Sequence, residues 1–319
     1  MSRAARVAAG LLLGAALLAW LIATVDLRGA AAAARAATPG SVAGIGGLTL
    51  AFLLLKTWRW RVLLGEMPAP RRLLLRGVML GSALNYVLPQ AGEAARVAIL
   101  HDGPRRPPAA LLASIAAERV MDMLAVALLA SIVATGPAGA VGGLPVAPVL
   151  LACSLAAVGI VALAIRAPAG FAEGLARGVA WAGAGAADSV RRHARDAIAG
   201  LQPLRSPRVV AAAFALSALQ WACMAGAVAL AMAGVGLAPE PSAAALTTVV
   251  LVAGLLLPSA PGYAGTTQAA FVVALAPLGN DPGSALAASL VYNVVVVGTV
   301  LVVALPFALP RGGGPGRQP

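Results

Sequence analysis

Charged side chains are scarce in this chain. Asp, Glu, Lys and Arg make up 11% of its 319 residues, and 61% are hydrophobic. Soluble domains carry about 25% charged residues, so this composition excludes a soluble globular protein. The scarcity leaves long uncharged runs at 7–25, 36–55, 123–165, 209–239, 241–280 and 282–310. A helix needs about 20 residues to cross a membrane, so these runs predict an all-α polytopic membrane protein.

Cysteines and catalytic motifs are also scarce or missing. The two cysteines, Cys153 and Cys223, both lie in apolar runs, and they are too few for a disulfide framework. The sequence contains no GxxxxGK[ST], HExxH, CxxC or GxSxG motif, which are the common signatures of phosphate binding, zinc hydrolysis, redox and acyl-transfer chemistry. We therefore expect no catalytic residues, no metal site and no cofactor, and we expect that the protein is not an enzyme.

Acidic residues are outnumbered, which gives a net charge of +12. Basic residues of polytopic proteins mark cytoplasmic loops, and no basic cluster here is interleaved with aromatics as on an RNA-binding surface. We therefore expect no nucleic-acid partner. Arg3 and Arg6 precede the first apolar run, and Arg311 and Arg317 follow the last, so both termini are predicted to be cytoplasmic.

Two segments, 73–102 and 242–277, share one plan. Each has an apolar run of about sixteen residues, a Pro/Gly break and a second run of about twelve. Neither half is long enough to cross a bilayer. Broken backbone at membrane depth is tolerated only where protein buries it or where it lines a cavity. Such segments at matching positions in two halves of a transporter point to its substrate site.

Assigning basic clusters to the cytoplasm predicts six transmembrane helices plus two re-entrant helical hairpins in an inverted repeat. The predicted spans are 7–25, 36–55, 109–135, 146–165, 209–234 and 284–309. The first hairpin enters from the cytoplasm and the second from outside, so the half at about 146–310 repeats the half at about 1–135 upside down. All of 1–319 is one integral membrane domain in this interpretation. The alternative is that either hairpin is two tilted spans.

Two basic segments have open interpretations. Residues 166–208 contain apolar positions at helical spacing among many arginines, which predicts a cytoplasmic interfacial helix on anionic lipid or a solvated loop. The segment KTWRWRVLL mixes tryptophan and arginine directly after the run 36–55. We assign it to a dense cytoplasmic basic loop, where it either anchors the protein in the headgroup belt or captures substrate.

Ionisable residues inside a predicted span are expensive and usually functional. The motif AAERVMDML places Glu118, Arg119 and Asp122 about ten residues into the third span. Arg119 and Asp122 are three residues apart and can pair on one helix face. This group is either a polar site for a lipid headgroup, or a gate, or an ion cluster that only ties helices together.

The breaks of the two hairpins carry further candidates. The first contributes Asn85, Pro89, Gly92, Glu93 and Arg96. The free N–H groups at the start of its returning helix favour an anion. Arg96 either binds phosphate oxygens or anchors the hairpin at the interface.

The second break, PSAPGYAGTTQ, is uncharged and supplies hydroxyls and the amide of Gln268. Its Gly262 and Gly265 permit a tight turn. These polar groups either bind a ligand or satisfy the broken backbone.

Four motifs in order, WRWRVLL, NYVLPQAGEAARVAIL, AAERVMDMLAVALL and LLLPSAPGYAGTTQAAFVVAL, resemble the transmembrane-region family of lysylphosphatidylglycerol synthases, also called flippase-like. The resemblance spans about residues 40–310. It covers Leu88, Pro89, Gly92, Glu93 and Arg96 in the first hairpin, and Glu118, Arg119 and Asp122 in the third span. In the second hairpin it covers Pro258, Pro261, Gly262 and Gly265, with Tyr263 in place of a glycine and Gln268 in place of the usual acid.

The resemblance implies a lipid flippase or transporter of a bacterial inner membrane. It implies the lipid-translocating half and not the aminoacyltransferase domain of larger members. The substrate would be a phospholipid or a polyprenyl- or hopanoid-type lipid, with an anionic or aminoacylated headgroup contacted by Arg96 and Arg119. Two alternatives remain: an accessory membrane subunit that partners a lipid-synthesis enzyme, and an integral-membrane lipid transferase.

Overall fold

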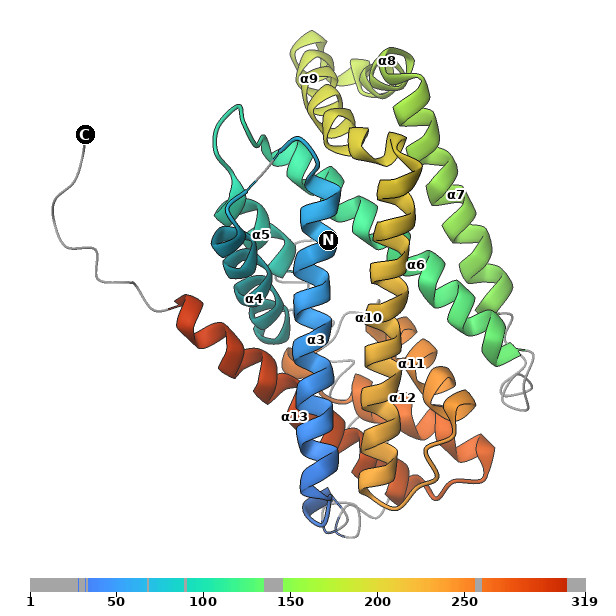
Figure 1. Cartoon of the computed structure of the whole chain (residues 1–319). Helices are drawn as coiled ribbons and strands as arrows, with labels where there is room; N and C mark the ends of the chain where they lie inside the picture. Colours follow the sequence, from blue (N-terminus) through green and yellow to red (C-terminus); the bar gives the residue numbers. More distant parts are fainter. Residues whose placement is uncertain are drawn as a thin grey trace, which may run out of the picture.

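The computed structural model describes residues 34–67, 69–88, 91–134, 146–255 and 260–308, together with Arg28 and Ala32. These residues form eleven α-helices and no β-strand (Figure 1), which confirms the all-α prediction. The α-helices are α3 (Pro39–Leu64), α4 (Arg71–Val87), α5 (Ala91–Leu100), α6 (Pro108–Ala134), α7 (Val146–Arg166), α8 (Pro168–Gly178), α9 (Ala184–Leu201), α10 (Pro207–Gly234), α11 (Pro241–Leu255), α12 (Thr266–Leu275) and α13 (Pro282–Ala308). The predicted span 7–25, and Pro89 and Pro258, lie outside the described residues.

Prolines set where many of these helices begin. The first residue of α3, α6, α8, α10, α11 and α13 is proline. Proline suits this position because its fixed φ is helical and its missing N–H would have no helical partner there. Side chains add caps: the Thr38 hydroxyl accepts a hydrogen bond from the Ser41 N–H at 3.3 Å, and Asp281 Oδ2 accepts one from the Ser284 N–H at 2.8 Å.

Three helices of the described structure, α3, α10 and α13, are long and apolar enough to cross a membrane. They have 26, 28 and 27 residues, which corresponds to about 40 Å of helix. The α6 helix also has 27 residues, but it carries three charged side chains in its middle. The α7 helix has 21 residues, and the chain bends by 110° between it and α8. The protein is therefore a multi-pass membrane protein.

The long helices α3 and α10 lie side by side and antiparallel through small residues (Figure 1). Gly44 of α3 faces Leu230 of α10, and Gly226 and Gly234 of α10 face Leu48 and Ser41 of α3. Because lipid tails are as apolar as the side chains, membrane helices associate through close backbone approach. Glycine provides that approach here.

Each segment with a predicted break is a pair of short helices packed on each other: α4 with α5, and α11 with α12. In the first pair the backbones nearly touch. A Cβ on Gly92 would overlap the carbonyl oxygen of Gly81. A Cβ on Gly81 would lie 2.8 Å from the carbonyl oxygen of Gly92. In the second pair, a Cβ on Gly254 would lie 2.9 Å from the Thr266 methyl group.

The two helix pairs meet at their breaks. Tyr86, at the end of α4, packs edge-on against Tyr263, in the short 3-10 helix Pro261–Tyr263 that precedes α12; the ring centroids are 5.6 Å apart. The pairs also contact long helices that are distant in the sequence, since α4 packs on α13 and α11 packs on α6. Tyr86 and Tyr263, beside the two breaks, are therefore brought together.

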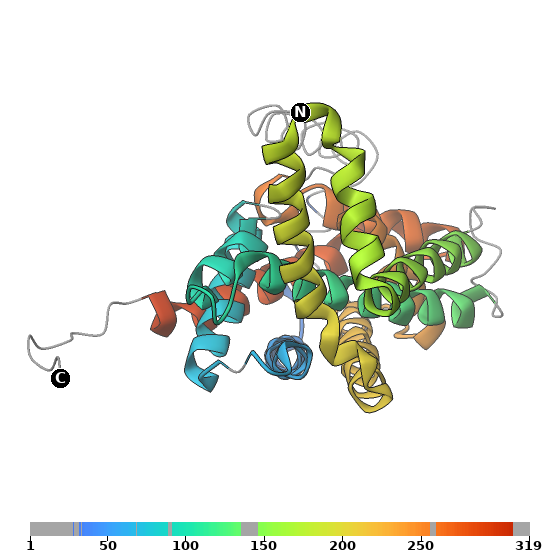
Figure 2. The ribbon, with the colours of Figure 1, turned by 90° about the horizontal axis from the view of Figure 1, so that it is seen from above.

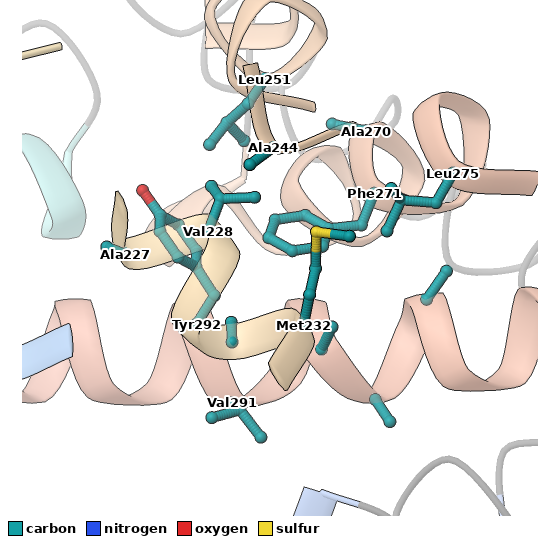
Figure 3. Packing of buried hydrophobic residues seen from close by; sticks show 14 of the residues in the cluster. Ala227, Val228, Met232, Ala244, Leu251, Ala270, Phe271, Leu275, Val291 and Tyr292 are labelled. Atoms are coloured by element: carbon teal, nitrogen blue, oxygen red, sulfur yellow. The ribbon is translucent and has the colours of Figure 1, made fainter. Parts of the chain in front are cut away.

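The largest apolar core lies around the second pair. It joins α10, α11, α12 and α13 and is centred on Phe271, which packs on Tyr292 at 5.5 Å between ring centroids and lies beside Met232 (Figure 3). Apolar side chains of α11 and α12 thus pack on those of α10 and α13.

The predicted basic loop after residue 55 is wrong in its first part. The α3 helix continues to Leu64, so Lys56, Arg59 and Trp60 are helical, and Arg59 and Trp60 are fully buried. Trp58, with 63% of its surface exposed, and the exposed Arg61 remain suited to the headgroup belt. Charges interrupted the hydropathy pattern here, but the buried face of the helix continues past them.

The segment 166–208 is helical, as the interfacial-helix interpretation requires. It consists of α8 and α9, which pack against each other, with short 3-10 turns after each. Figure 2 shows the two helices side by side and extending away from α3 and α10. Trp181 lies between them with 87% of its surface exposed.

Candidate functional site

Seven charged side chains gather where α3, α5 and α6 meet, and we call them the charged cluster. They are Lys56, Arg59, Glu93, Arg96, Glu118, Arg119 and Asp122. Helical spacing puts them there: each helix contributes residues three or four apart, which lie on one face. The helices α3 and α5 both pack on α6, and Arg96 of α5 lies against Trp60 of α3, so the faces converge.

The innermost pair joins α5 to α6. Arg96 donates two hydrogen bonds to Glu118, Nη1 to Oε2 at 2.7 Å and Nη2 to Oε1 at 3.0 Å, and both side chains are 2% exposed. The Arg96 guanidinium also lies 3.9 Å from the centre of the Trp60 ring. Trp60 is held in turn by a 3.0 Å hydrogen bond from its Nε1 to Ser114 Oγ. Arg96 is therefore fixed on both sides.

A second buried pair joins α3 to α6 and reaches α10. Both terminal nitrogens of Arg59 donate to the Asp122 carboxylate, and Nη1 also donates to Ser217 Oγ at 2.6 Å. The Trp221 indole donates to Asp122 Oδ1 at 3.1 Å. Arg59 Nη2 lies 3.8 Å from Glu118 Oε2, which links the two buried pairs into one network.

A third pair lies at the edge of this network. Arg119 donates to Glu93 Oε1 and lies 3.8 Å from Asp122. Its side chain is 53% exposed, in contrast with the 2% of Arg59 and Arg96. Glu93 Oε2 is buried and has no hydrogen-bond partner in the described structure. This pair is therefore the part of the network that a ligand can reach.

The energetics of the two kinds of pair differ. A buried ion pair adds little net stability, but the loss of one partner leaves an uncompensated charge that costs about 3–5 kcal/mol. An exposed pair contributes only about 0–1 kcal/mol. The Arg96–Glu118 and Arg59–Asp122 pairs thus fix the geometry of three helices, whereas Arg119 can exchange partners at low cost.

Five residues proposed from the sequence do come together here: Glu93, Arg96, Glu118, Arg119 and Asp122. The pairing of Arg119 with Asp122 along α6 is present at 3.8 Å. The closer contacts run between helices, from Arg96 to Glu118 and from Arg119 to Glu93. Arg96 is buried and paired inside the bundle. It is therefore neither free to bind phosphate nor placed at the interface as an anchor.

Sequence reasoning missed Ser217 and Trp221, and it considered Lys56, Arg59 and Trp60 only as part of a loop that either anchors the protein or captures substrate. Arg59 and Trp60 follow Lys56 by three and four residues, a spacing that is typical of one helix face. Extending the helix of residues 36–55 through that spacing would have found them. Ser217 and Trp221, also four apart, lie inside a long apolar run that gives no comparable signal.

The remaining candidates in the first pair have structural contacts. Asn85 Oδ1 accepts a 2.7 Å hydrogen bond from the Gly92 N–H, which connects the end of α4 to the start of α5. Gly92 is buried where the two backbones approach most closely.

The second break is shaped by backbone conformation. Gly262, Tyr263 and Gly265 have φ values of +69°, +54° and +81°, a region that glycine adopts without strain. Gln268 is buried, and its Oε1 accepts a 2.8 Å hydrogen bond from the Gly265 N–H at the start of α12. Pro261 is exposed. Gln268 therefore caps a helix, which favours the structural interpretation of this residue.

The described residues contain no group of three or more His, Cys, Asp or Glu side chains arranged to hold a metal ion. The cluster instead offers guanidinium, ammonium and carboxylate groups. Such groups can form ion pairs and charge-assisted hydrogen bonds with a charged ligand.

The fold and the site thus define the class of this protein: it is a multi-pass helical membrane protein with paired charges at a broken helix. The family model of the lysylphosphatidylglycerol synthase TM region matches residues 7–304. The chain belongs to this family, which confirms the resemblance and points to a lipid-related function in the membrane. No curated protein and no solved structure matches it significantly.

Proposed function

We propose that this protein is a flippase or transporter that moves lipid headgroups across a bacterial inner membrane. The observation that carries the proposal is the half-exposed Arg119, paired with Glu93, in the middle of a helix of 27 residues. A charge at that depth is expensive unless it faces a cavity or a partner. A mobile headgroup is such a partner, and the family is one of lipid-related membrane proteins.

An inverted repeat of six spans and two re-entrant hairpins is part of the proposal. It pairs α3 with α10, α4 with α11, α5 with α12 and α6 with α13. The contacts support it because they are reciprocal: α3 packs on α13 as α10 packs on α6, and α4 packs on α13 as α11 packs on α6. The antiparallel packing of α3 and α10 is what a two-fold axis in the membrane plane requires. In this topology both termini are cytoplasmic.

The headgroup would pass where the two breaks meet, beside Tyr86 and Tyr263, while the acyl chains stay in the lipid. The two buried ion pairs would hold α3, α5 and α6 as a rigid wall. Arg119 would exchange Glu93 for an anionic group of the lipid. The unpartnered oxygen Glu93 Oε2 would accept a hydrogen bond from a hydroxyl or ammonium of the same headgroup.

Lipid flipping by the purified protein in liposomes tests this function. The probes are fluorescent phosphatidylglycerol, aminoacylated phosphatidylglycerol and a polyprenyl phosphate, with a membrane-impermeant quencher as readout. We expect at least one lipid to lose inner-leaflet protection. Arg119→Gln should slow this about tenfold or more, because a charge-assisted hydrogen bond is worth about 1.5–3 kcal/mol. Arg105→Gln, an exposed arginine in the loop between α5 and α6, is the matched control.

Two results would overturn the proposal. A folded protein that flips none of the lipids would favour the accessory-subunit alternative, for which co-purification with a lipid-synthesis enzyme is the next measurement. Labelling of a single cysteine at position 105 from the outer side alone would contradict a first hairpin that enters and leaves on the cytoplasmic side.

A further inference from the structure

The charged cluster does not balance its own charge. It contains four cations, Lys56, Arg59, Arg96 and Arg119, and three carboxylates, Glu93, Glu118 and Asp122. Each carboxylate is paired with an arginine. Lys56 forms no ion pair in the described structure. One positive charge is therefore left over, whichever rotamers the side chains adopt.

Lys56 lies against this network and not apart from it. On α3 it precedes Arg59 by three residues and Trp60 by four, which places it on their face of the helix. One helical turn further along α3, Arg59 donates to Asp122 and Trp60 lies under the Arg96 guanidinium. It is half-buried, and it is the only lysine of the chain.

The neighbouring helices supply no further acid to offset the charge. Among the other helices that pack on α3, the described part of α13 contains no charged residue, α10 contains only Arg208 at its start, and α4 contains arginines but no acid. In an environment of low dielectric an unpaired charge is costly. An anion from outside the chain would remove that cost.

We infer that Lys56 and Arg119 together form a binding site for the phosphate group of an anionic lipid. Lysine is a compact point charge that suits phosphate, and Arg119 is the cluster's exposed guanidinium. Arg59 and Arg96 are occupied by carboxylates and take no part. This inference rests on the proposed function, and it adds Lys56 to the groups that would contact the lipid.

The single lysine permits a direct test on the full-length protein in detergent. Reductive methylation with ¹³C-formaldehyde labels Lys56 and the N-terminal amine, and Lys56→Arg identifies the Lys56 signal. The probes are a short-chain phosphatidylglycerol and inorganic phosphate at equal concentration. We expect the lipid to shift the Lys56 signal saturably, and phosphate to shift it little.

Variants separate a binding role from a structural one. Lys56→Gln should weaken phosphatidylglycerol binding about tenfold, the effect of one charge-assisted hydrogen bond, and Lys56→Arg should retain it. Arg61→Gln, an exposed residue of the same helix, should leave binding unchanged. Without lipid, Lys56→Gln should unfold at a higher temperature than the native chain, because it removes an unpaired charge.

Three outcomes would overturn the inference: a Lys56 signal that no lipid moves, equal saturation by inorganic phosphate, or unchanged lipid affinity in Lys56→Gln. Other results distinguish a failure of the Lys56 site from a failure of the proposed function. Flipping that survives in Lys56→Gln but is lost in Arg119→Gln refutes the Lys56 site alone. Absence of flipping by the native chain refutes the function even where the Lys56 signal responds to lipid.

Discussion

The two broken helix pairs share a plan but differ in what holds them. In the first pair, α4 and α5, the helix α5 is tied to α6 by two ion pairs of the charged cluster and to α3 by the contact of Arg96 with Trp60. The second pair, α11 and α12, is uncharged and packs through Phe271 and its apolar neighbours. Its threonines Thr247 and Thr248 donate to carbonyl groups of their own helix. The same arrangement of two short helices is thus held by ion pairs in one case and by apolar packing in the other.

This difference indicates which helix pair carries the functional groups. Ion pairs are directional and fix the identity of each partner, whereas apolar packing depends mainly on shape. A pair of helices held by charges can present those charges to a ligand. The second pair has no such groups among its described residues, so we assign it the role of a scaffold that places its break against the first.

The largest expected effect on stability is in the charged cluster. Glu118→Gln removes the carboxylate that accepts from Arg96 and faces Arg59, so it should lower the free energy of unfolding by about 3–5 kcal/mol. Thermal unfolding followed by size-exclusion chromatography measures this. Glu66→Gln, at an exposed position just after α3, is the control.

A double variant sharpens that prediction. Arg96→Met with Glu118→Leu replaces both charges by apolar groups, and it should recover most of the stability because no charge is left unpaired at that position. Equal stability of Glu118→Gln and the native chain would contradict the network described above.

A smaller effect is expected from glycine substitutions, one in each pair. Gly92→Ala forces its methyl into the Gly81 carbonyl, which is backbone and cannot rotate away, so a loss of about 1–3 kcal/mol is expected. Gly254→Ala meets only the Thr266 methyl at 2.9 Å, a side chain that can adjust. Its loss should be under about 1 kcal/mol. Parallel thermal unfolding of both variants compares them, and a larger loss in Gly254→Ala would reverse the comparison.

The helix cap in the second pair should have a comparable or smaller effect. Gln268→Ala leaves the buried Gly265 N–H without its acceptor, which should cost about 1 kcal/mol. Gln268→Glu keeps an acceptor oxygen and restores the acid usual in the family, so its stability should be close to native. If Gln268→Glu instead changed transport and left stability intact, the second break would have a role in binding.

The smallest effect is expected outside both pairs, at an exposed ion pair. Arg191 of α9 donates to Glu173 of α8 at 2.9 Å, and this contact lowers the pKa of the Glu173 carboxyl. A lowered folded-state pKa gives stability that is present above the unfolded pKa of about 4.3 and is lost as the pH falls through the folded value. Glu173→Gln should therefore slightly reduce the thermal midpoint at about pH 7 and have no effect at about pH 2. An effect at about pH 7 as large as that of Glu118→Gln would show that burial is not what separates the two pairs.

Much of the fold could be predicted from the sequence. The expected spans 109–135, 146–165, 209–234 and 284–309 agree within two residues with α6, α7, α10 and α13. The two breaks also fall where expected, between α4 and α5 and between α11 and α12. Helices and breaks are local properties, since twenty apolar residues or a Pro/Gly interruption act without distant partners. The inverted repeat stays a prediction that the reciprocal contacts support.

The partners within the site were decided by tertiary structure. The sequence by itself determined that Glu118, Arg119 and Asp122 lie on one membrane helix and that Glu93 and Arg96 follow a break. It could not assign Arg96 to Glu118, or Arg59 to Asp122 and Ser217, because those residues are 22, 63 and 158 positions apart. The strength of a charge pair depends on distance and burial. Only the packing of α3, α5, α6 and α10 sets those two quantities, and it leaves Lys56 as the one cation without a carboxylate among the described residues of the cluster.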